Sequence, residues 1–213
     1  MTAHLKLLLN GLIISCAIVA LGSLNFAGFI LVKKEWDQKK EQLVERSHQL
    51  GLAYELQVNF KVQVQEWKNV LLRGHREADF QKYHHQFNQR SRTVQAGLEE
   101  LIAMPSLDDP LRRQAVRFRD QHLEIGKAYH NALTAHSLGD PSAPFRIDAA
   151  VRGIDRPPML LLDQLVGNIA ESTRADTKRM EREMARIVNG LILLSAVCLL
   201  VAIALVLGSG FVG

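Results

Sequence analysis

Hydrophobic residues gather in two unbroken stretches, one near each end of the chain. The first covers residues 5–32 and the second covers residues 187–212, and after Lys6 neither contains a charged residue. A helix rises about 1.5 Å per residue, so about 20 apolar residues cross the hydrocarbon core of a bilayer. The pattern therefore predicts two transmembrane helices at residues 5–32 and 187–212, with a short N-terminal tail at residues 1–4.

A cleaved signal peptide is the alternative explanation of the first stretch. Signal peptides have apolar cores of about 7–15 residues, followed by a cleavage site made of small residues. The first stretch is longer than that and runs directly into Lys33 and Lys34. We therefore expect an uncleaved anchor.

The middle segment, residues 33–186, has helical periodicity and almost no strand signal. Its apolar residues recur every three or four positions, and short breaks containing glycine or proline interrupt the pattern. Proline inside a helix removes a backbone donor, so Pro157 and Pro158 predict a kink or bulge. The predicted helices run from the first anchor to about Arg73, over about residues 77–103, from about Asp108 to the next break, and from about Ser142 through the kink into the second anchor.

Four helices joined by short breaks predict an all-α fold. The expected architecture is an antiparallel, up-down-up-down four-helix bundle over residues 33–186, flanked by the two transmembrane helices. In such a bundle, the helix–helix register places Trp67, Tyr83 and Tyr129 in one aromatic layer far from the membrane. Lys61, Lys68, Arg152 and Arg156 are expected near this layer.

Charge and cysteine usage exclude several classes of protein. The middle segment carries 25 basic and 22 acidic residues, with both signs interspersed. A nucleic-acid-binding protein would instead show a concentrated basic patch. Both cysteines, Cys16 and Cys198, lie in the anchors, so the middle segment has no disulfide framework, zinc motif or haem-attachment motif. Basic residues flank the middle segment, but the positive-inside rule applies to short loops, so charge alone does not set the orientation.

Two segments of the middle region resemble a known family. Residues 60–74 (FKVQVQEWKNVLLRG) are similar to the first sensing helix of a group of bacterial methyl-accepting chemotaxis proteins, and residues 151–157 (VRGIDRP) resemble the matching part of their fourth helix. The resemblance implies a periplasmic, ligand-sensing bundle, usually dimeric, in a bacterial inner membrane. Similar bundles also occur on sensor kinases and cyclases, so the resemblance does not fix the output module.

Receptors of that family continue into a HAMP relay and a long cytoplasmic hairpin with methylation sites. The sequence shows no such segment before Gly213. We therefore expect either a truncated receptor or a stand-alone sensor half, with its downstream signalling module absent from this chain.

The basic residues are candidates for a ligand pocket. A guanidinium fork matches the geometry of a carboxylate, so the predicted ligand is a small organic or amino acid. The resemblance implies arginines on the first and fourth helices for this role. The alternative is a set of solvated charges paired with Glu66, Asp79 or Asp155. The candidate ligand-binding residues are Lys61, Trp67, Lys68, Arg73, Tyr83, Tyr129, Arg152 and Arg156, of which the three aromatic residues could equally be core residues.

The histidines of the middle segment could in principle bind a metal ion or haem, but the spacing of histidine and glutamate residues does not favour this hypothesis. Di-iron bundles need two Glu-x-x-His motifs, and the sequence contains one, Glu45 with His48. We expect hydrogen-bonded or exposed histidines, with haem binding and pH sensing as alternatives. The histidines of the middle segment include His75, His84, His85, His122, His130 and His136.

The sequence contains no catalytic constellation and no phosphate-binding glycine loop. We therefore expect a protein that is not an enzyme and needs no cofactor. The predicted function is that of a transmembrane chemoreceptor or transducer: a small extracytoplasmic ligand binds the bundle, and a helix shift crosses the membrane. The expected partners are this ligand, the lipid bilayer and a second copy of the chain, but not nucleic acid. The alternatives are the sensor half of a kinase or cyclase receptor, or an oligomerising membrane tether that senses nothing.

Overall fold

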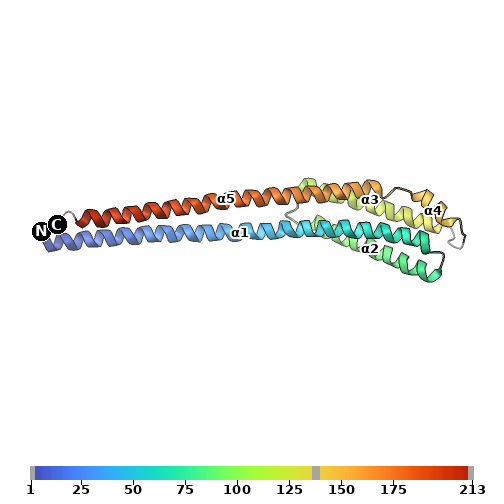
Figure 1. The fold of residues 1–213 in the computed structure, drawn as a ribbon, viewed down its shortest axis with the longest axis horizontal. Coiled ribbons are helices and arrows are strands. Elements are labelled where there is room, and N and C mark those ends of the chain that lie inside the picture. Colours follow the sequence, from blue (N-terminus) through green and yellow to red (C-terminus); the bar gives the residue numbers. More distant parts are fainter. Residues whose placement is uncertain (1–2, 136–139, 211–213) are drawn as a thin grey trace. The chain divides into compact units, whose positions relative to one another are not determined.

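A computed structural model describes residues 3–135 and 140–210, and every regular element in those ranges is a helix. This confirms the all-α prediction for the described residues, whereas His136 lies outside them. The five helices are α1 (Ala3–Arg73), α2 (Glu77–Ala103), α3 (Asp109–Thr134), α4 (Ala143–Val151) and α5 (Arg156–Gly210) (Figure 1).

Helix ends lie where local sequence signals predict them. α1 ends at Arg73, and the N–H of Gly74 donates to the carbonyl oxygen of Val70 at 2.9 Å. A Cβ on residue 74 would lie 2.3 Å from that oxygen, so the position requires glycine. At the start of α3, Pro110 lies in the first turn, where a backbone N–H has no helical acceptor in any case.

The fourth predicted helix is two helices in the structure. The chain breaks between Val151 and Arg156, where Gly153 has a φ of +77°, a left-handed conformation that glycine adopts without steric cost. Pro157 and Pro158 then lie in the first turn of α5, where the missing N–H groups break no helical hydrogen bond. The prediction of a kink inside one helix is therefore wrong: these prolines belong to the start of a new helix.

The turn between α2 and α3 is held by arginine side chains. Arg112 donates to the carbonyl oxygen of Ile102 in the last turn of α2, which lacks a helical partner, and to the turn carbonyl oxygens of Met104 at 2.8 Å and Leu107 at 3.0 Å. Arg46 of α1 donates two hydrogen bonds, at 3.0 and 3.2 Å, to the carboxylate of Asp108. These contacts join α1 to the turn that connects its two neighbours.

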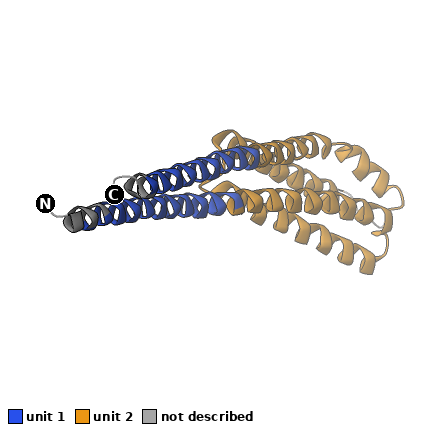
Figure 2. Ribbon diagram, turned by 60° about the vertical axis from the view of Figure 1, so that its left-hand side comes forward, with its two compact units in different colours: residues 1–43, 176–213 blue, residues 44–175 orange. Residues whose placement is uncertain are grey.

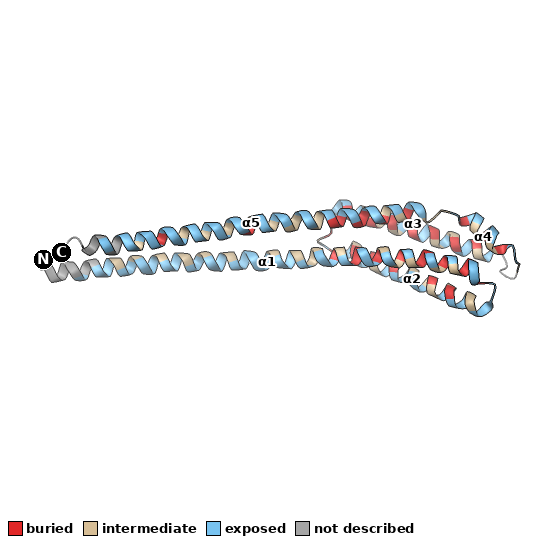
Figure 3. Cartoon of the chain, viewed as in Figure 1, coloured by how far each residue is buried: buried red, intermediate tan, exposed pale blue. Residues whose placement is uncertain are grey.

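The chain divides into two compact units, and both α1 and α5 contribute to each (Figure 2). We call residues 44–175 the helical domain, and the parts of α1 and α5 outside it, residues 1–43 and 176–213, the paired-helix unit. By length and composition, two helices could cross a membrane, with windows of mean hydropathy 2.1 in Gly11–Arg73 and 2.7 in Arg156–Ala204. Their apolar side chains are largely exposed (Figure 3), as lipid-facing residues must be.

A polar contact joins the two helices of the paired-helix unit within the apolar stretches. The hydroxyl of Ser195 donates to Oδ1 of Asn25 at 2.8 Å, and Nδ2 of Asn25 donates to the carbonyl oxygen of Leu21 at 3.0 Å. A Cβ added to Gly28 would lie 3.0 Å from Cδ2 of Leu191, so the helices approach closely one turn away. Hydrogen bonds and small residues at close contacts are the devices by which helices associate in lipid.

Outside the apolar stretches, the ammonium of Lys39 bonds the carboxylate of Glu183, again between α1 and α5. This bond raises the pKa of Lys39 and lowers the pKa of Glu183. The residue numbers 25 with 195, 28 with 191 and 39 with 183 rise along α1 as they fall along α5. These three contacts therefore specify a single register for the pair.

The helical domain has one apolar core to which all five helices contribute (Figure 3). Phe60 and Phe118 pack edge to face with ring centroids 5.4 Å apart, and both are fully buried. Leu162, Leu165 and Ile169 of α5 recur at three- and four-residue spacings on the buried face. The other core side chains that are at most 2% exposed are those of Ala53, Leu56, Val94, Leu98, Leu101, Leu107, Ala115, Tyr129, Ala143 and Ile147.

We expect the Asn25–Ser195 hydrogen bond to stabilise the paired helices by about 1 kcal/mol, within the range measured for such bonds in membrane proteins. The test is a double-mutant cycle with Asn25→Leu and Ser195→Ala, measured as unfolding free energy by detergent titration. The two substitutions should be non-additive, because each removes the same bond. Asn189→Leu is the matched control, because Asn189 is an exposed asparagine of α5. Additive effects of the pair would contradict the assignment.

Candidate ligand-binding site

An aromatic layer crosses the helical domain at the end where α1 finishes. Trp67 of α1, Phe87 of α2 and Tyr129 of α3 are all buried, with ring centroids 4.2 Å apart for Trp67 and Tyr129 and 5.7 Å apart for Trp67 and Phe87. Burial raises the pKa of the Tyr129 hydroxyl, and the carboxylate of Asp155 adds to the shift. The rings pack on one another, so the layer forms part of the core.

Tyr83 lies beside this layer and pairs with Arg73. Nη1 of Arg73 donates to the Tyr83 hydroxyl at 2.6 Å, and the guanidinium carbon lies 5.4 Å from the ring centroid. Lys82 approaches the same ring at 5.1 Å. The structure thus brings Trp67 and Tyr129 together as predicted, while Phe87 occupies the place in the layer expected for Tyr83.

The other predicted basic residues do not converge on one point. Lys61 lies 3.6 Å from the carboxylate of Asp163 in α5, and Arg152 donates to Asp148 one turn earlier in α4 at 2.6 Å. Arg156 packs its side chain over the Gly153 turn, with Nε 3.6 Å from the position of a Cβ there. Lys68 is exposed on α1.

A buried polar cluster, which the sequence analysis did not predict, links three helices. Nε2 of His122 in α3 lies 2.7 Å from Oε1 of Gln63 in α1, and Nδ1 of His122 contacts Nε2 of Gln95 in α2. Both His122 and Gln63 are at most 1% exposed. In this geometry the neutral ring donates from Nε2 and accepts at Nδ1. A second proton on Nδ1 would face the Gln95 amide, which is itself a donor.

Burial lowers the pKa of His122 to about 4. The cause is desolvation, which disfavours the charged ring. The cluster also leaves Nε2 of Gln63 buried without a hydrogen-bond partner among the described residues. An unpaired buried amide costs free energy, so the hydrogen bond between His122 and Gln63 is accompanied by an unsatisfied donor on the same glutamine.

Among the other histidines that the structure describes, His84 is half-buried and His48, His75, His85 and His130 are not buried. His84 stacks on Phe80 with centroids 5.2 Å apart, and partial burial together with the nearby His130 lowers its pKa. His48 lies 3.6 Å from Glu100 in α2. Among residues 3–135 and 140–210, no three His, Cys, Asp or Glu side chains are grouped so that they could hold a metal ion.

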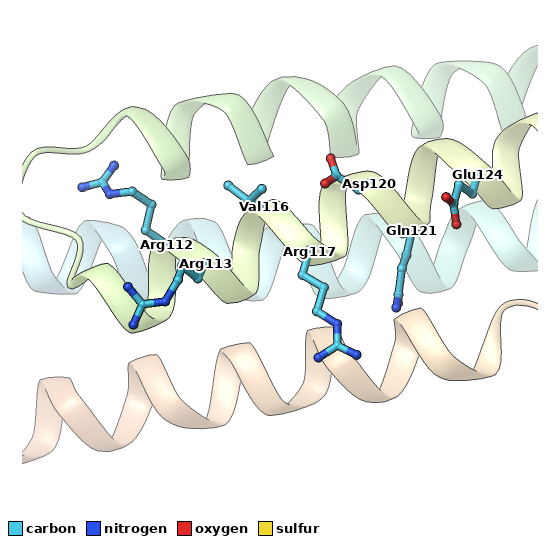
Figure 4. A pocket seen from close by; sticks show the side chains of 7 residues that line it. All are labelled: Arg112, Arg113, Val116, Arg117, Asp120, Gln121 and Glu124. Atoms are coloured by element: carbon cyan, nitrogen blue, oxygen red, sulfur yellow. The ribbon is translucent and has the colours of Figure 1, made fainter.

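A groove of about 380 Å³ runs along the outward face of α3 (Figure 4). Arg117 and Gln121 point toward α5, whereas Val116 and Asp120 lie on the side of α2. All lining positions follow the three- and four-residue spacing of one helix face. The lining residues are Arg112, Arg113, Val116, Arg117, Asp120, Gln121 and Glu124.

Sequence reasoning did not single out this groove. Its charges lie on a polar helix face, and such a face is normally solvated. The available signal was the order of the charges: Arg113 and Arg117 are four residues apart, and Asp120 and Glu124 repeat that spacing one turn later. Gln63 and Gln95 likewise carry no sequence signal, because only the packing of α1, α2 and α3 shows that they meet His122.

Fold and site together define an all-helical protein in which a helical domain lies, in sequence, between two candidate membrane spans. No protein-family model and no solved structure matches the chain. Over 147 residues it is 31% identical to the methyl-accepting chemotaxis protein CtpH of Pseudomonas aeruginosa. The aligned part is 68% of this chain and 25% of that protein, so the chain spans about a quarter of the relative's length. The similarity supports a family like that of the methyl-accepting chemotaxis proteins.

We predict that acid destabilises the helical domain through His122. Its pKa is about 4 in the folded state and about 6.5 when unfolded, so the folded state binds fewer protons. The contribution of the neutral ring to stability is present above about pH 6.5 and is lost progressively as the pH falls from 6.5 to 4, so the helical domain should be less stable at pH 4 by about 3 kcal/mol.

Chemical unfolding of wild type and His122→Gln at pH 7, 5.5 and 4 measures this difference. The variant keeps an amide in place of the ring but has nothing to titrate, so its stability should fall less with pH. His75→Gln, at an exposed histidine of the same domain, controls for removal of a histidine. Equal pH dependence in wild type and His122→Gln would contradict the role of this residue.

Proposed function

We propose that this chain is the sensor region of a transmembrane chemoreceptor. The similarity to a methyl-accepting chemotaxis protein is the observation that carries the proposal. The two candidate membrane spans support it, because a receptor of this kind needs an anchor on each side of its sensing domain. In this proposal the spans are residues 5–32 and 187–212, the membrane is a bacterial inner membrane, and the segment between them is periplasmic. The role is one of binding and signalling rather than catalysis.

Within this proposal, the helical domain is an antiparallel, up-down-up-down four-helix bundle. The contacts between helices support such an arrangement. Phe60 pairs with Phe118, and Trp67 pairs with Tyr129, so residue numbers rise together along α1 and α3. Pairs whose numbers rise in α1 while they fall in α2 are Asn59 with Arg90, Trp67 with Phe87, and Arg73 with Tyr83.

In the proposed mechanism, α5 carries the signal. It is one helix from Arg156 to Gly210, so a displacement at its start is transmitted along its length without a hinge. Shifts of about 1–2 Å are typical of helices in signalling transitions. A ligand produces such a shift only if it binds the two positions of the helix with different affinity. The ligand is proposed to be a small molecule that contacts the helical domain.

A chimera tests the proposed function. Residues 1–213 are joined to the part of the Pseudomonas protein that follows its aligned region, and the chimera is expressed in a strain without other chemoreceptors. We expect at least one compound from a panel of organic acids, amino acids and short peptides to change swimming bias. The reason is that a shift of α5 would be passed to the attached signalling part. The matched control is the same chimera with three glycines inserted after Thr177, which should insert normally but uncouple the helix.

A chimera that reaches the membrane, supports normal unstimulated swimming and responds to no compound would contradict a direct sensing role. That result would favour a kinase or cyclase sensor half with another output, or a tether that only oligomerises.

We further propose that the receptor is a homodimer that pairs through α1. Val44, Val58 and Leu72 are exposed by 62%, 59% and 74% and lie fourteen residues, or two heptads, apart on one stripe of α1, with Gln65 at the position between the last two. Gly51 lies midway between Val44 and Val58. Tyr54 lies on the same stripe, and both Gly51 and Tyr54 are exposed. A seven-residue repeat of apolar residues is the pattern by which two helices pack along their length.

Disulfide formation in membranes checks this proposal. In a Cys16→Ser, Cys198→Ser background, Val58→Cys should give a dimer on mild oxidation, because the two copies of residue 58 would face each other across a two-fold axis. Ala96→Cys, at an exposed position of α2, is the control that should stay monomeric. Equal cross-linking of the two variants would show random collision and contradict the α1 interface.

A further inference from the structure

Unpaired charges line the groove on α3. The guanidinium groups of Arg113 and Arg117, four residues apart, make no ion pair or hydrogen bond with any described residue, and the same is true of the Glu124 carboxylate. The other charged groups of the groove are engaged: Arg112 donates to carbonyl oxygens of the α2–α3 turn, and Asp120 accepts from Arg119 at 2.9 Å. The groove therefore presents two free cations at one end and a free anion at the other.

The charges follow a fixed order along the helix. Arg113 and Arg117 come first, and Asp120 and Glu124 come later on the same face (Figure 4). From Arg117 to Glu124 is seven residues, or about 10 Å at 1.5 Å per residue. A dicarboxylate would meet repulsion at the Glu124 end, and a polyamine would meet repulsion at the Arg113 end. The complementary molecule is a zwitterion whose two charges are about 10 Å apart.

The side chains between the two ends indicate what joins those charges. Gln121 lies between Arg117 and Glu124, and its Oε1 is buried without a hydrogen-bond partner among the described residues. Because Oε1 is buried, this side chain offers a ligand its Nε2 amide, which can donate to a carbonyl oxygen such as that of a peptide bond. The aliphatic part of Arg117 supplies apolar surface on the same side as Gln121, and Val116 does so on the side of α2.

We propose that the groove on α3 binds a short peptide with free termini, about three residues long. An extended chain spans about 3.3–3.6 Å per residue, so a tripeptide places its ammonium and carboxylate groups about 10 Å apart. The carboxylate lies against Arg117, whose guanidinium group can donate paired hydrogen bonds, and Arg113 adds a second positive charge one turn further from Glu124. The ammonium lies against Glu124, and the peptide amide meets Gln121. A free α-amino acid is too short to reach both ends.

This inference rests on the proposed sensing function, because it names the ligand class of the receptor. The position of the groove next to α5 fits a role in signalling. Arg117 and Gln121 point toward α5 (Figure 4), and Nδ2 of Asn168 in α5 donates to Oε1 of Gln114 in α3 at 3.0 Å. A peptide held at this edge would therefore be bound next to the helix that leads to the second candidate membrane span.

Isothermal titration of the complete chain in detergent micelles with trialanine tests the proposal. We expect saturable binding of one peptide per chain. Arg117→Gln and Glu124→Gln should each weaken it by about tenfold or more, because each removes a charge-assisted contact. Arg92→Gln, at an exposed arginine of α2 that makes no ion pair with any described residue, is the matched control and should bind as wild type does. Circular dichroism confirms that each variant keeps its helical content.

A peptide with a blocked N-terminus tests whether the ammonium group of the ligand contacts Glu124. N-acetyl-trialanine lacks the ammonium group, so it should bind as weakly to wild type as trialanine binds to Glu124→Gln. The Glu124→Gln substitution should then cause no further loss with the blocked peptide. Absence of trialanine binding by the folded wild type, or equal binding of the free and blocked peptides, would overturn the proposal. So would unchanged affinity in Arg117→Gln.

The result of the trialanine titration can be distinguished from the result of the chimera experiment. If the chimera responds to some compound while trialanine does not bind, the sensing function stands and this site is wrong. If trialanine binds as described but the chimera responds to nothing, the site stands and the proposed relay is wrong.

Discussion

The structure depends on one constraint: α1 and α5 must each satisfy two environments along a single helix. In lipid, every backbone donor and acceptor needs a partner inside its own segment, which helices provide. In the helical domain, the same helices must bury only one face against their neighbours. α1 accordingly changes from a segment that is mostly exposed, as at Leu12 and Phe29, with only partly buried positions such as Asn25, to a regular buried stripe that includes Leu56 and Phe60. The change of pattern within one helix separates the candidate span from the helical domain.

Apolar packing alone would not fix how these helices slide past one another. The polar contacts do this in both units. In the helical domain, His122 contacts Gln63 and Gln95 on two other helices, and a slip of one residue would break both contacts and leave the buried His122 and Gln63 side chains without them. In the paired-helix unit, Asn25 of α1 pairs with Ser195 of α5. For a protein proposed to signal by small helix shifts, such contacts define the resting register from which a shift is measured.

Local chemistry explains which parts of this structure were predictable. The end of α1 at Arg73 and both ends of α2 follow from glycine, proline and apolar spacing, all of which act within a few residues. The break before α5 was missed, because Gly153 could either be tolerated inside a helix or end one, and only the fold decides. The presence of Trp67 and Tyr129 in one layer followed from periodicity, but the choice of Phe87 over Tyr83 depends on helix rotation. The α3 groove was missed because a sequence does not show which charged side chains have a partner in the folded protein and which have none.

The position of the groove bears on how binding could be read out. A ligand buried in the aromatic layer would have to separate Trp67, Phe87 and Tyr129, and so would lose the packing that holds the domain together. A ligand in the groove disturbs none of these contacts, since Arg113, Arg117 and Glu124 have no partners among the described residues to give up. Its binding free energy is then available to favour one position of the adjacent α5 over another. An open, charged groove beside the helix that contains the second candidate membrane span is therefore better suited to be a receptor site than the aromatic cluster in the core.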